Sequence, residues 1–312
     1  MSEPIFPDSV WVSKPWAGSR LSTMRKAAAS PEKPLGICRE ICAYKGSENP
    51  VSRGKYAGMN LKQIIDVHHN AIMGTDDRDQ LLRVAYMDTA APLSVQVHPD
   101  ASLAAEAGDY EKAEAWYVLD CEPGSFLYAG TTTVDKAALR LAAENDNLCN
   151  YLQKIYVKPG DFITIPAGLI HACGANMLVV ETGTFGGITY RIWDYGSTRP
   201  LDIEDGFRAL HPELTYTLVH NPLRERTKTE VSPGVRHPLF ECDVVDIADT
   251  WICSTEGRYR VLSVVDSDCV LQVEGTDYPL NFTETVLVPA DVKQFTVKGN
   301  CRIIASQMPL PV

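Results

Sequence analysis

The sequence predicts an all-β fold with helical insertions. Residues 92–100 (PLSVQVHPD) alternate apolar and polar side chains with a period of two, which is the pattern of a β-strand. Residues 237–312 read as many short β segments separated by turns. Two longer stretches, about 60–73 and 134–155, carry apolar residues at helical spacing. A chain of 312 residues is long enough to bury the cores of two such β domains.

Composition excludes several classes of partner. The formal net charge of −11 argues against nucleic acid. No apolar run reaches the roughly 18 residues that a membrane span needs, and the N-terminus lacks a basic-then-apolar signal pattern, so we expect a cytoplasmic protein without a membrane partner. The nine scattered cysteines form no C-x-x-C pair, which favours buried thiols over disulfides or a thiolate metal site. The sequence specifies no oligomeric state.

The N-terminal part supplies a lead-in, a strand, a helix and a second strand. Residues 1–35 are rich in proline and serine and are expected to be extended. Residues 36–44 (GICREICAY) are typical of a strand. The helix over 60–73 places Leu61 and its apolar neighbours on one side. Residues 81–87 (LLRVAYM) then predict a strand that leads into the central one.

The central strand, 92–100, is expected to separate an apolar face from a polar one. Leu93, Val95 and Val97 would pack outward under a covering layer. Successive side chains on a strand point to opposite faces, so the polar set lies on the inner side. That set consists of Ser94, Gln96 and His98.

Two further segments add polar groups of the same kind. Lys112 and Glu114 alternate in EKAEAWYVLD, so both would lie on one face. The segment 158–174 (KPGDFITIPAGLIHACG) contains two tight turns and carries His171. Imidazole and oxygen ligands placed on strands suit one zinc ion, with manganese or iron as alternatives. The predicted ligands are Gln96, His98, Glu114 and His171.

The stretch 134–155 reads as a helix inserted between the strand of Glu114 and the turn of His171. Such an insertion forms either a wall over a site or a packing element, and the sequence leaves both open. Residues 177–194 return to strands, and 200–210 (PLDIEDGFRAL) contain a short acidic helix. The core-facing side of the inserted helix is predicted to consist of Ala137, Ala138, Leu141, Leu148 and Leu152.

The polar stretch near 221–232 predicts a boundary between a domain at 1–220 and a smaller β domain at 233–312. FITIPAGLIHA and VLVPADVKQFT can be aligned at Pro166 and Pro289, which puts Gln294 at the position of His171. Either the smaller domain is a degenerate copy that has lost its metal site, or the match is a coincidence.

Four separated motifs resemble those of the type I mannose-6-phosphate isomerases of the short bacterial kind. They are SVQVHPD, the K-x-E-x-W of 112–116, GDFITIPAGLIHA, and TYRIWDYGS at 189–197. The similarity runs from about Trp16 to Leu210, with a weaker tail. It implies a cupin (jelly-roll) barrel, which the smaller C-terminal β domain, degenerate and cupin-like on the alignment above, would follow. It also implies a zinc-dependent aldose–ketose isomerase that interconverts mannose 6-phosphate and fructose 6-phosphate through a cis-enediol.

The resemblance assigns roles beyond the metal ligands. Arg191 would act in the active site, with a structural ion pair to Glu181 as the alternative. Lys112 is the candidate base or proton carrier, with a metal-bound water as its rival. The substrate is a small sugar phosphate. Residues expected to contact it are Ser94, Glu181 and Arg199.

Two positions depart from the family pattern. Ser197 stands where the family carries a basic residue associated with phosphate, and Gly187 stands where an Asp is common. Arg199 is close enough in sequence to substitute for the missing cation. The departures keep two alternatives open: a cupin metalloenzyme acting on another or unphosphorylated sugar, and a sugar-binding cupin without catalysis.

Overall fold

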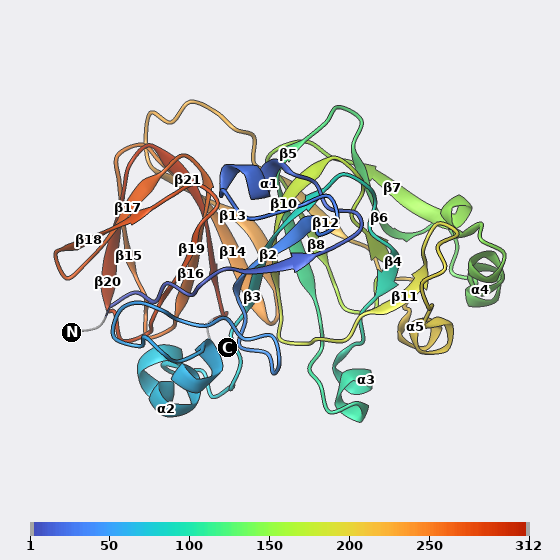
Figure 1. Ribbon diagram of the computed structural model, residues 1–312, viewed down its shortest axis with the longest axis horizontal. Coiled ribbons are helices and arrows are strands. Elements are labelled where there is room, and N and C mark those ends of the chain that lie inside the picture. The colour runs from blue at the N-terminus through green and yellow to red at the C-terminus, as the bar shows by residue number, and fades with distance from the viewer. Residues whose placement is uncertain (1–2, 310–312) are drawn as a thin grey trace. The chain divides into compact units, whose positions relative to one another are not determined.

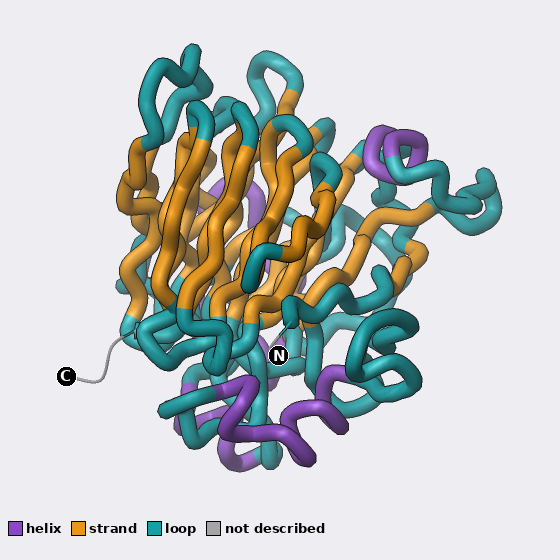
Figure 2. The backbone as a smooth tube through the Cα atoms, turned by 90° about the vertical axis from the view of Figure 1, so that its left-hand side faces the viewer, coloured by secondary structure: helices purple, strands orange, loops and turns teal. Residues whose placement is uncertain are grey.

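The structure is a computed structural model that describes residues 3–309 (Figure 1). Strands are the main regular structure and run side by side in Figure 2, and the helices are short, which confirms the predicted all-β class with helical insertions. Two compact units are present. One contains Trp11–Ile37 and Met87–His220, and we call it the N-terminal barrel. The other contains the described parts of 1–10, 38–86 and 221–312, and we call it the C-terminal barrel.

The strands of the N-terminal barrel belong to two sheets, and three of them are cut by the division between the units. The seven-stranded sheet has the order β1 (Val10–Ser13), β2 (Leu35–Ile41), β3 (Arg83–Thr89), β10 (Met177–Gly183), β5 (Glu114–Cys121), β8 (Asp161–Ile165) and β12 (Thr217–His220). The five-stranded sheet has the order β11 (Tyr190–Trp193), β4 (Val95–Val97), β9 (His171–Ala172), β6 (Phe126–Thr131) and β7 (Leu152–Tyr156).

The core of this barrel lies between its two sheets. Trp116 and Val118 of β5 share one buried apolar cluster with Leu127 and Ala129 of β6. Apolar residues of facing sheets interdigitate in this way in β-sandwiches and jelly rolls. Packed apolar side chains therefore fill part of the barrel interior. The polar residues of β4, β5 and β9 lie in another part of it.

The outer face of β4 is covered as the sequence predicted. Val95 and Val97 pack in one cluster with Leu139 of α4 (Lys136–Glu144) and Phe207 of α5 (Ile203–Ala209). The prediction for Leu93 is wrong, because this residue belongs to the inner cluster with Trp116. The regular strand begins only at Val95, so the alternation does not extend back to residue 93.

The predicted helix over 134–155 is also wrong in its length. α4 ends at Glu144, a 3-10 turn covers Leu148–Tyr151, and Leu152 already begins β7. Leu141 is 61% exposed instead of core-facing. The buried residues of α4 are Leu139, Ala142 and Ala143.

Three further helices complete the described chain: α1 (Arg20–Met24), α2 (Leu61–Met73) and α3 (Ala101–Glu106). α2 matches the helix predicted over 60–73. Its N-cap is Asn60, whose side chain accepts a hydrogen bond from the Gln63 amide. The Gln63 side chain accepts one from the Asn60 amide, which completes a capping box. No helix in residues 3–309 combines the length and the apolar character that crossing a membrane would require.

The C-terminal barrel contains two smaller sheets. One has the order β13 (Glu230–His237), β14 (Phe240–Ile247), β21 (Cys301–Gln307), β16 (Arg260–Asp266) and β19 (Thr285–Val288). The other has the order β15 (Thr250–Ser254), β20 (Gln294–Lys298), β17 (Cys269–Val273) and β18 (Thr276–Leu280). Leu262 and Val264 share a buried cluster with Leu271 and Phe295, so the two sheets enclose one core.

The predicted domain boundaries, 1–220 and 233–312, stay a prediction. In the structure the C-terminal strands share their compact unit with 38–86, a segment that includes α2. A boundary read from composition is continuous in sequence, whereas compact units follow packing and can combine distant segments.

Candidate metal centre

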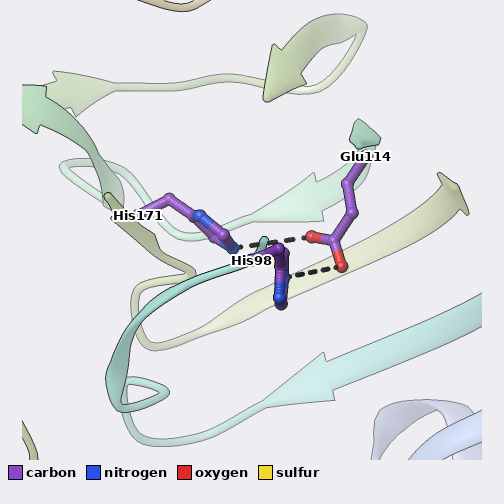
Figure 3. Close-up of side chains that lie close together, drawn as sticks. All are labelled: His98, Glu114 and His171. Carbon is purple, nitrogen blue, oxygen red and sulfur yellow. Dashed lines mark ion pairs between the residues drawn. The ribbon is translucent and has the colours of Figure 1, made fainter. Parts of the chain in front are cut away.

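Three buried side chains converge inside the N-terminal barrel. His98 directly follows β4, Glu114 begins β5 and His171 begins β9. Their ligand atoms all lie within 4.8 Å of one another, and Figure 3 shows the three side chains pointing toward a common centre. His98 Nε2 is 3.2 Å from Glu114 Oε1, and His171 Nε2 is 3.6 Å from Glu114 Oε2. The structure thus brings together three of the four predicted ligands from separate strands.

A backbone carbonyl orients each imidazole. His98 Nδ1 lies 3.0 Å from the carbonyl oxygen of Ile188, and His171 Nδ1 lies 2.9 Å from that of Leu169. A carbonyl accepts only from a protonated nitrogen, so these contacts assign the hydrogen to Nδ1 in both rings. The lone pair of each Nε2 is then on the side of Glu114, and that of His98 also faces Lys112 Nζ at 3.3 Å. This arrangement is typical of metal-ligating histidines, whose second nitrogen donates to a carbonyl or carboxylate.

The residues present fit a divalent cation. Glu114 Oε2 and His171 Nε2 are buried without a hydrogen-bond partner. Leaving a buried polar atom unsatisfied costs about 1–3 kcal/mol, so such atoms need an explanation in a native protein. A metal ion held by both atoms would satisfy them together. Two imidazoles and a carboxylate are a ligand set that suits zinc.

The charge state of the cluster also suits a metal. Burial, assisted by the Lys112 ammonium, lowers the pKa of His98 to about 3. Burial likewise lowers the pKa of His171. Burial by itself would raise the pKa of Glu114, but Lys112 and then His98 hold it well below its ordinary value. The cluster therefore presents two neutral imidazoles and one carboxylate, which are the forms that bind metal.

Lys112 joins the cluster, as its alternation with Glu114 predicted. Its Nζ donates to Glu114 Oε1 over 2.7 Å and lies 3.3 Å from His98 Nε2. A longer bond of 3.5 Å reaches the hydroxyl of Thr189. The ammonium is mostly buried, so it is held at the edge of the centre instead of moving freely in solvent.

Gln96 and Arg191 lie on the same face as His171. β4 is paired on one side with β9, where Gln96 stands opposite His171, and on the other with β11, where it stands opposite Arg191. Directly opposite residues of paired strands project to the same side of a sheet. Glu181 lies on β10 opposite Trp116 of β5. It is outside the group formed by His98, Glu114 and His171.

The two predicted arginines, Arg191 and Arg199, have different partners. Arg191 donates from Nε to the Ser94 hydroxyl over 3.4 Å and from Nη1 to the Pro200 carbonyl over 2.9 Å. Ser94, Gln96 and Arg191 are therefore neighbours, as the motifs required. Arg199 instead forms a two-pronged ion pair with the buried carboxylate of Asp194, with Nε 2.6 Å from Oδ2. This pairing neutralises the charge of Arg199 within the protein.

Sequence reasoning missed the groups that orient the ligands. The carbonyl of Ile188 lies in TFGGI, a segment that the sequence marked only as a departure from the family pattern. Asp109 and Thr189 were not singled out either. Asp109 accepts a hydrogen bond from the Ile188 amide, and Thr189 accepts one from Lys112. A backbone carbonyl in a loop has no periodic or compositional signature, so no pattern in the sequence pointed to it.

The chain is a cupin with a candidate metal site formed by His98, Glu114 and His171. Comparisons with known proteins identify more specific relatives. The family model described as "Mannose-6-phosphate isomerase, cupin domain" matches residues 235–308. The chain is 28% identical to the putative mannose-6-phosphate isomerase YvyI of Bacillus subtilis, over 98% of this chain and 99% of the relative. It is 26% identical to ManA of the same organism, a mannose-6-phosphate isomerase, with the same coverage.

Solved structures give the same result. The crystal structure of the mannose 6-phosphate isomerase from Bacillus subtilis matches with a TM-score of 0.88 and 28% identity, over 98% of this chain and 99% of that one. A putative mannosephosphate isomerase from Archaeoglobus fulgidus shares the fold, with a TM-score of 0.79 at 20% identity. The predicted resemblance to the mannose-6-phosphate isomerases is confirmed. The predictions of a cupin fold and of an enzyme of the isomerase type are confirmed as well. The similarity extends past Leu210 to nearly the whole chain.

Proposed function

We propose that this chain is a cytoplasmic, zinc-dependent isomerase that interconverts mannose 6-phosphate and fructose 6-phosphate. The observation that carries the proposal is the buried cluster of His98, Glu114 and His171 with Lys112 against it. The full-length similarity to isomerases of this activity supports it. Manganese or iron is the alternative to zinc, with one ion per chain.

The ligands would be Nε2 of His98, Nε2 of His171 and the carboxylate of Glu114, with Gln96 as a fourth. The neutral amide of Gln96 would leave the centre with a net positive charge. When bound, the ion supplies Lewis acidity that orients and polarises the oxygens on carbons 1 and 2 of the sugar. Gln96 supports this set because it stands directly opposite His171 on the neighbouring strand.

Proton transfer is assigned to Lys112. In the direction from aldose to ketose, a base must remove the proton from carbon 2 and return one to carbon 1 of the cis-enediol. The Nζ atom of Lys112 is held beside Glu114 and His98, at the edge of the centre. The neutral amine would take the proton from carbon 2, and the ammonium so formed would return it to carbon 1 on the same side, which accounts for both steps.

Arg191 is assigned to charge stabilisation. Negative charge develops on the sugar oxygens as the enediol forms, and a fixed guanidinium stabilises it without reorganisation. Ser94 and the Pro200 carbonyl hold the guanidinium, and its strand position places it beside Gln96. We propose that Ser94, Glu181 and Arg199 contact the rest of the substrate.

One observation favours a second candidate, an isomerase for an unphosphorylated sugar. Arg199 would replace the cation missing at Ser197, but Asp194 already neutralises it. A phosphate therefore meets less positive charge here than a free arginine would offer. A change of substrate keeps the metal centre, Lys112 and Arg191 in the same roles.

A coupled assay distinguishes the two candidates. The protein is stripped of metal, reloaded with zinc, and given mannose 6-phosphate or free mannose. Zinc-dependent formation of fructose 6-phosphate, without turnover of free mannose, is the expected result. Turnover of free mannose alone supports the second candidate. Zinc binding with turnover of neither compound contradicts the first candidate and favours another sugar substrate or a sugar-binding protein. A His98→Ala variant with full activity would contradict the metal assignment.

A further inference from the structure

The TFGGI segment, Thr184–Ile188, lies between the end of β10 and the start of β11, outside both sheets. Backbone groups that leave a sheet need other partners. The Thr184 amide donates to the Ala113 carbonyl over 2.9 Å, and the Gly186 amide donates to the Glu111 carbonyl over 3.3 Å. The segment is therefore docked on the stretch that leads into β5 and Glu114.

The glycine in the middle of this segment is required by close approach. A Cβ atom added at Gly186 would lie 2.2 Å from the carbonyl oxygen of Tyr110, closer than atoms can pack. The rings of Tyr110 and Phe185 also meet, with centroids 6.1 Å apart. The TFGGI segment thus has one defined place against residues 109–113.

Asp109 holds the far end of the segment. Its Oδ2 atom accepts hydrogen bonds from the amides of Gly187, at 2.9 Å, and Ile188, at 3.1 Å. Bonds from peptide groups to a carboxylate are stronger than those between neutral groups. Two successive peptide amides on one oxygen fix the orientation of the peptide between them.

The carbonyl of Ile188 is the group that orients His98, with 3.0 Å between its oxygen and Nδ1. The other ligand histidine is supported differently. His171 uses the carbonyl of Leu169, whose own amide donates to the Pro166 carbonyl over 3.1 Å within the same turn. The support of His171 is therefore built from local backbone, whereas the support of His98 depends on a loop that a side chain holds in place.

We propose that Asp109 is a positioning residue for the metal centre. By binding the Gly187 and Ile188 amides it restrains the backbone at Ile188, whose carbonyl, in the next peptide, sets the tautomer and ring orientation of His98. The proposal rests on the proposed metal-binding function. It adds a carboxylate that never touches the ion or the substrate but determines how well His98 is presented to the ion.

Three single variants test the proposal. Asp109→Ala removes both hydrogen bonds, and Asp109→Asn keeps one carbonyl oxygen that can accept both amides. Glu106→Ala is the matched control, because it removes an exposed carboxylate of the same charge, paired with Arg208, from the preceding helix. Zinc affinity is measured by chelator competition at constant pH, and the visible absorption spectrum is recorded on cobalt-loaded protein.

Loss of an outer partner of a ligand histidine costs about 10–100-fold in metal affinity, so Asp109→Ala should weaken zinc binding by about tenfold or more. Its cobalt spectrum should change because His98 is presented differently. Asp109→Asn should stay within about threefold of the unmodified protein. Glu106→Ala should alter neither the affinity nor the spectrum. Asp109→Ser, too short to reach both amides, gives a second truncation should the alanine variant fold poorly.

Unchanged zinc affinity and an unchanged cobalt spectrum in Asp109→Ala would overturn the positioning role. An equal loss in Asp109→Asn would also overturn it, because the acceptor geometry would then not be what matters. A protein that binds zinc but lacks isomerase turnover contradicts the proposed reaction, and the affinity comparison still decides the role of Asp109. A protein that binds neither zinc nor cobalt contradicts both proposals.

Discussion

Two turns and one strand pairing recur in the two barrels, next to buried side chains of opposite charge. Before β8, the Lys158 amide donates to the Asp161 carboxylate over 2.9 Å. Before β19, the Asn281 amide donates in the same way to Glu284 over 2.9 Å. After these strands, the Leu169 amide bonds the Pro166 carbonyl and the Val292 amide bonds the Pro289 carbonyl, both over 3.1 Å.

In both barrels the first turn contains one residue in the left-handed backbone conformation, at the same place. Gly160 has a φ of +91° in the N-terminal barrel, and Thr283 has a φ of +72° at the matching place in the C-terminal barrel. A β-branched residue adopts this conformation only under constraint from its surroundings. The turn has therefore kept its shape although the residue best suited to it is absent from the second copy.

Strand register identifies the residues that correspond. Glu114 stands opposite Ile165 where β5 meets β8, and Arg260 stands opposite Val288 where β16 meets β19. Arg260 thus takes the place of the carboxylate ligand. Arg258, two residues earlier, takes the place of Lys112.

The two ends balance their charges differently. In the C-terminal barrel the buried guanidinium groups of Arg258 and Arg260 both bind Glu256, over 2.6 Å and 3.1 Å. Each barrel has buried polar atoms without a hydrogen-bond partner, but of different kinds: acceptor atoms of Glu114 and His171 in the N-terminal barrel, and the Nε–H donors of Arg258 and Arg260 in the C-terminal barrel. The C-terminal barrel carries its cations on arginine side chains, whereas the N-terminal barrel has the groups that would bind a cation from solution. The same fold accommodates both, so the cluster of His98, Glu114 and His171 is not a requirement of the fold.

The largest expected effect is the loss of metal from the N-terminal barrel. His171→Ala removes a ligand and should reduce zinc content from about one ion per chain to nearly none, with turnover at least about 100-fold lower. Metal analysis after gel filtration measures the first effect and the coupled assay the second. Gln294→Ala changes the residue aligned with His171 and should affect neither. A loss of zinc in that control would mean that the second barrel also binds metal.

A smaller effect is expected from the charge cluster of the C-terminal barrel. Glu256→Gln removes the carboxylate shared by two buried arginines, which should lower the free energy of unfolding by about 2 kcal/mol. Glu256 is 53% exposed, so the effect is smaller than for a fully buried pair. Urea unfolding measures it, with Glu225→Gln, an exposed acid, as the control. Reduced turnover with unchanged stability would contradict a structural role.

Near neutral pH the smallest effect is a pH dependence of the metal-free protein. His98 has a pKa of about 3 in the folded state, below the ordinary 6.5 of an unfolded chain, so the unfolded state binds more protons between these values. The contribution of neutral His98 to the free energy of unfolding is therefore fully present above pH 6.5. It falls as the pH is lowered toward 3, by at most about 1.4 kcal/mol per pH unit. Urea titrations at several pH values would show it. His98→Gln should reduce the slope, and an unchanged slope would assign the acid sensitivity to other residues.

The sequence was most informative where side chains alternate along strands. The alternation of 92–98 and of 112–116 predicted that His98, Glu114 and Lys112 would share an interior, and the structure places them within hydrogen-bonding distance. Sequence was least informative at element ends. The apolar residues Leu148 and Leu152 continue a helical spacing past Glu144, but the chain has by then turned through a 3-10 segment into β7. Short apolar runs fit either period, and only packing decides between them.

By itself the sequence determined the fold class, the strands that carry the candidate ligands and the resemblance to the isomerases, because period and motif are local properties of the chain. Tertiary structure alone decided that the Ile188 carbonyl orients His98 and that Arg260 stands in the second barrel where Glu114 stands in the first. These relations join residues distant in sequence or depend on strand register. They are fixed only when the sheets pack, and no local pattern encodes them.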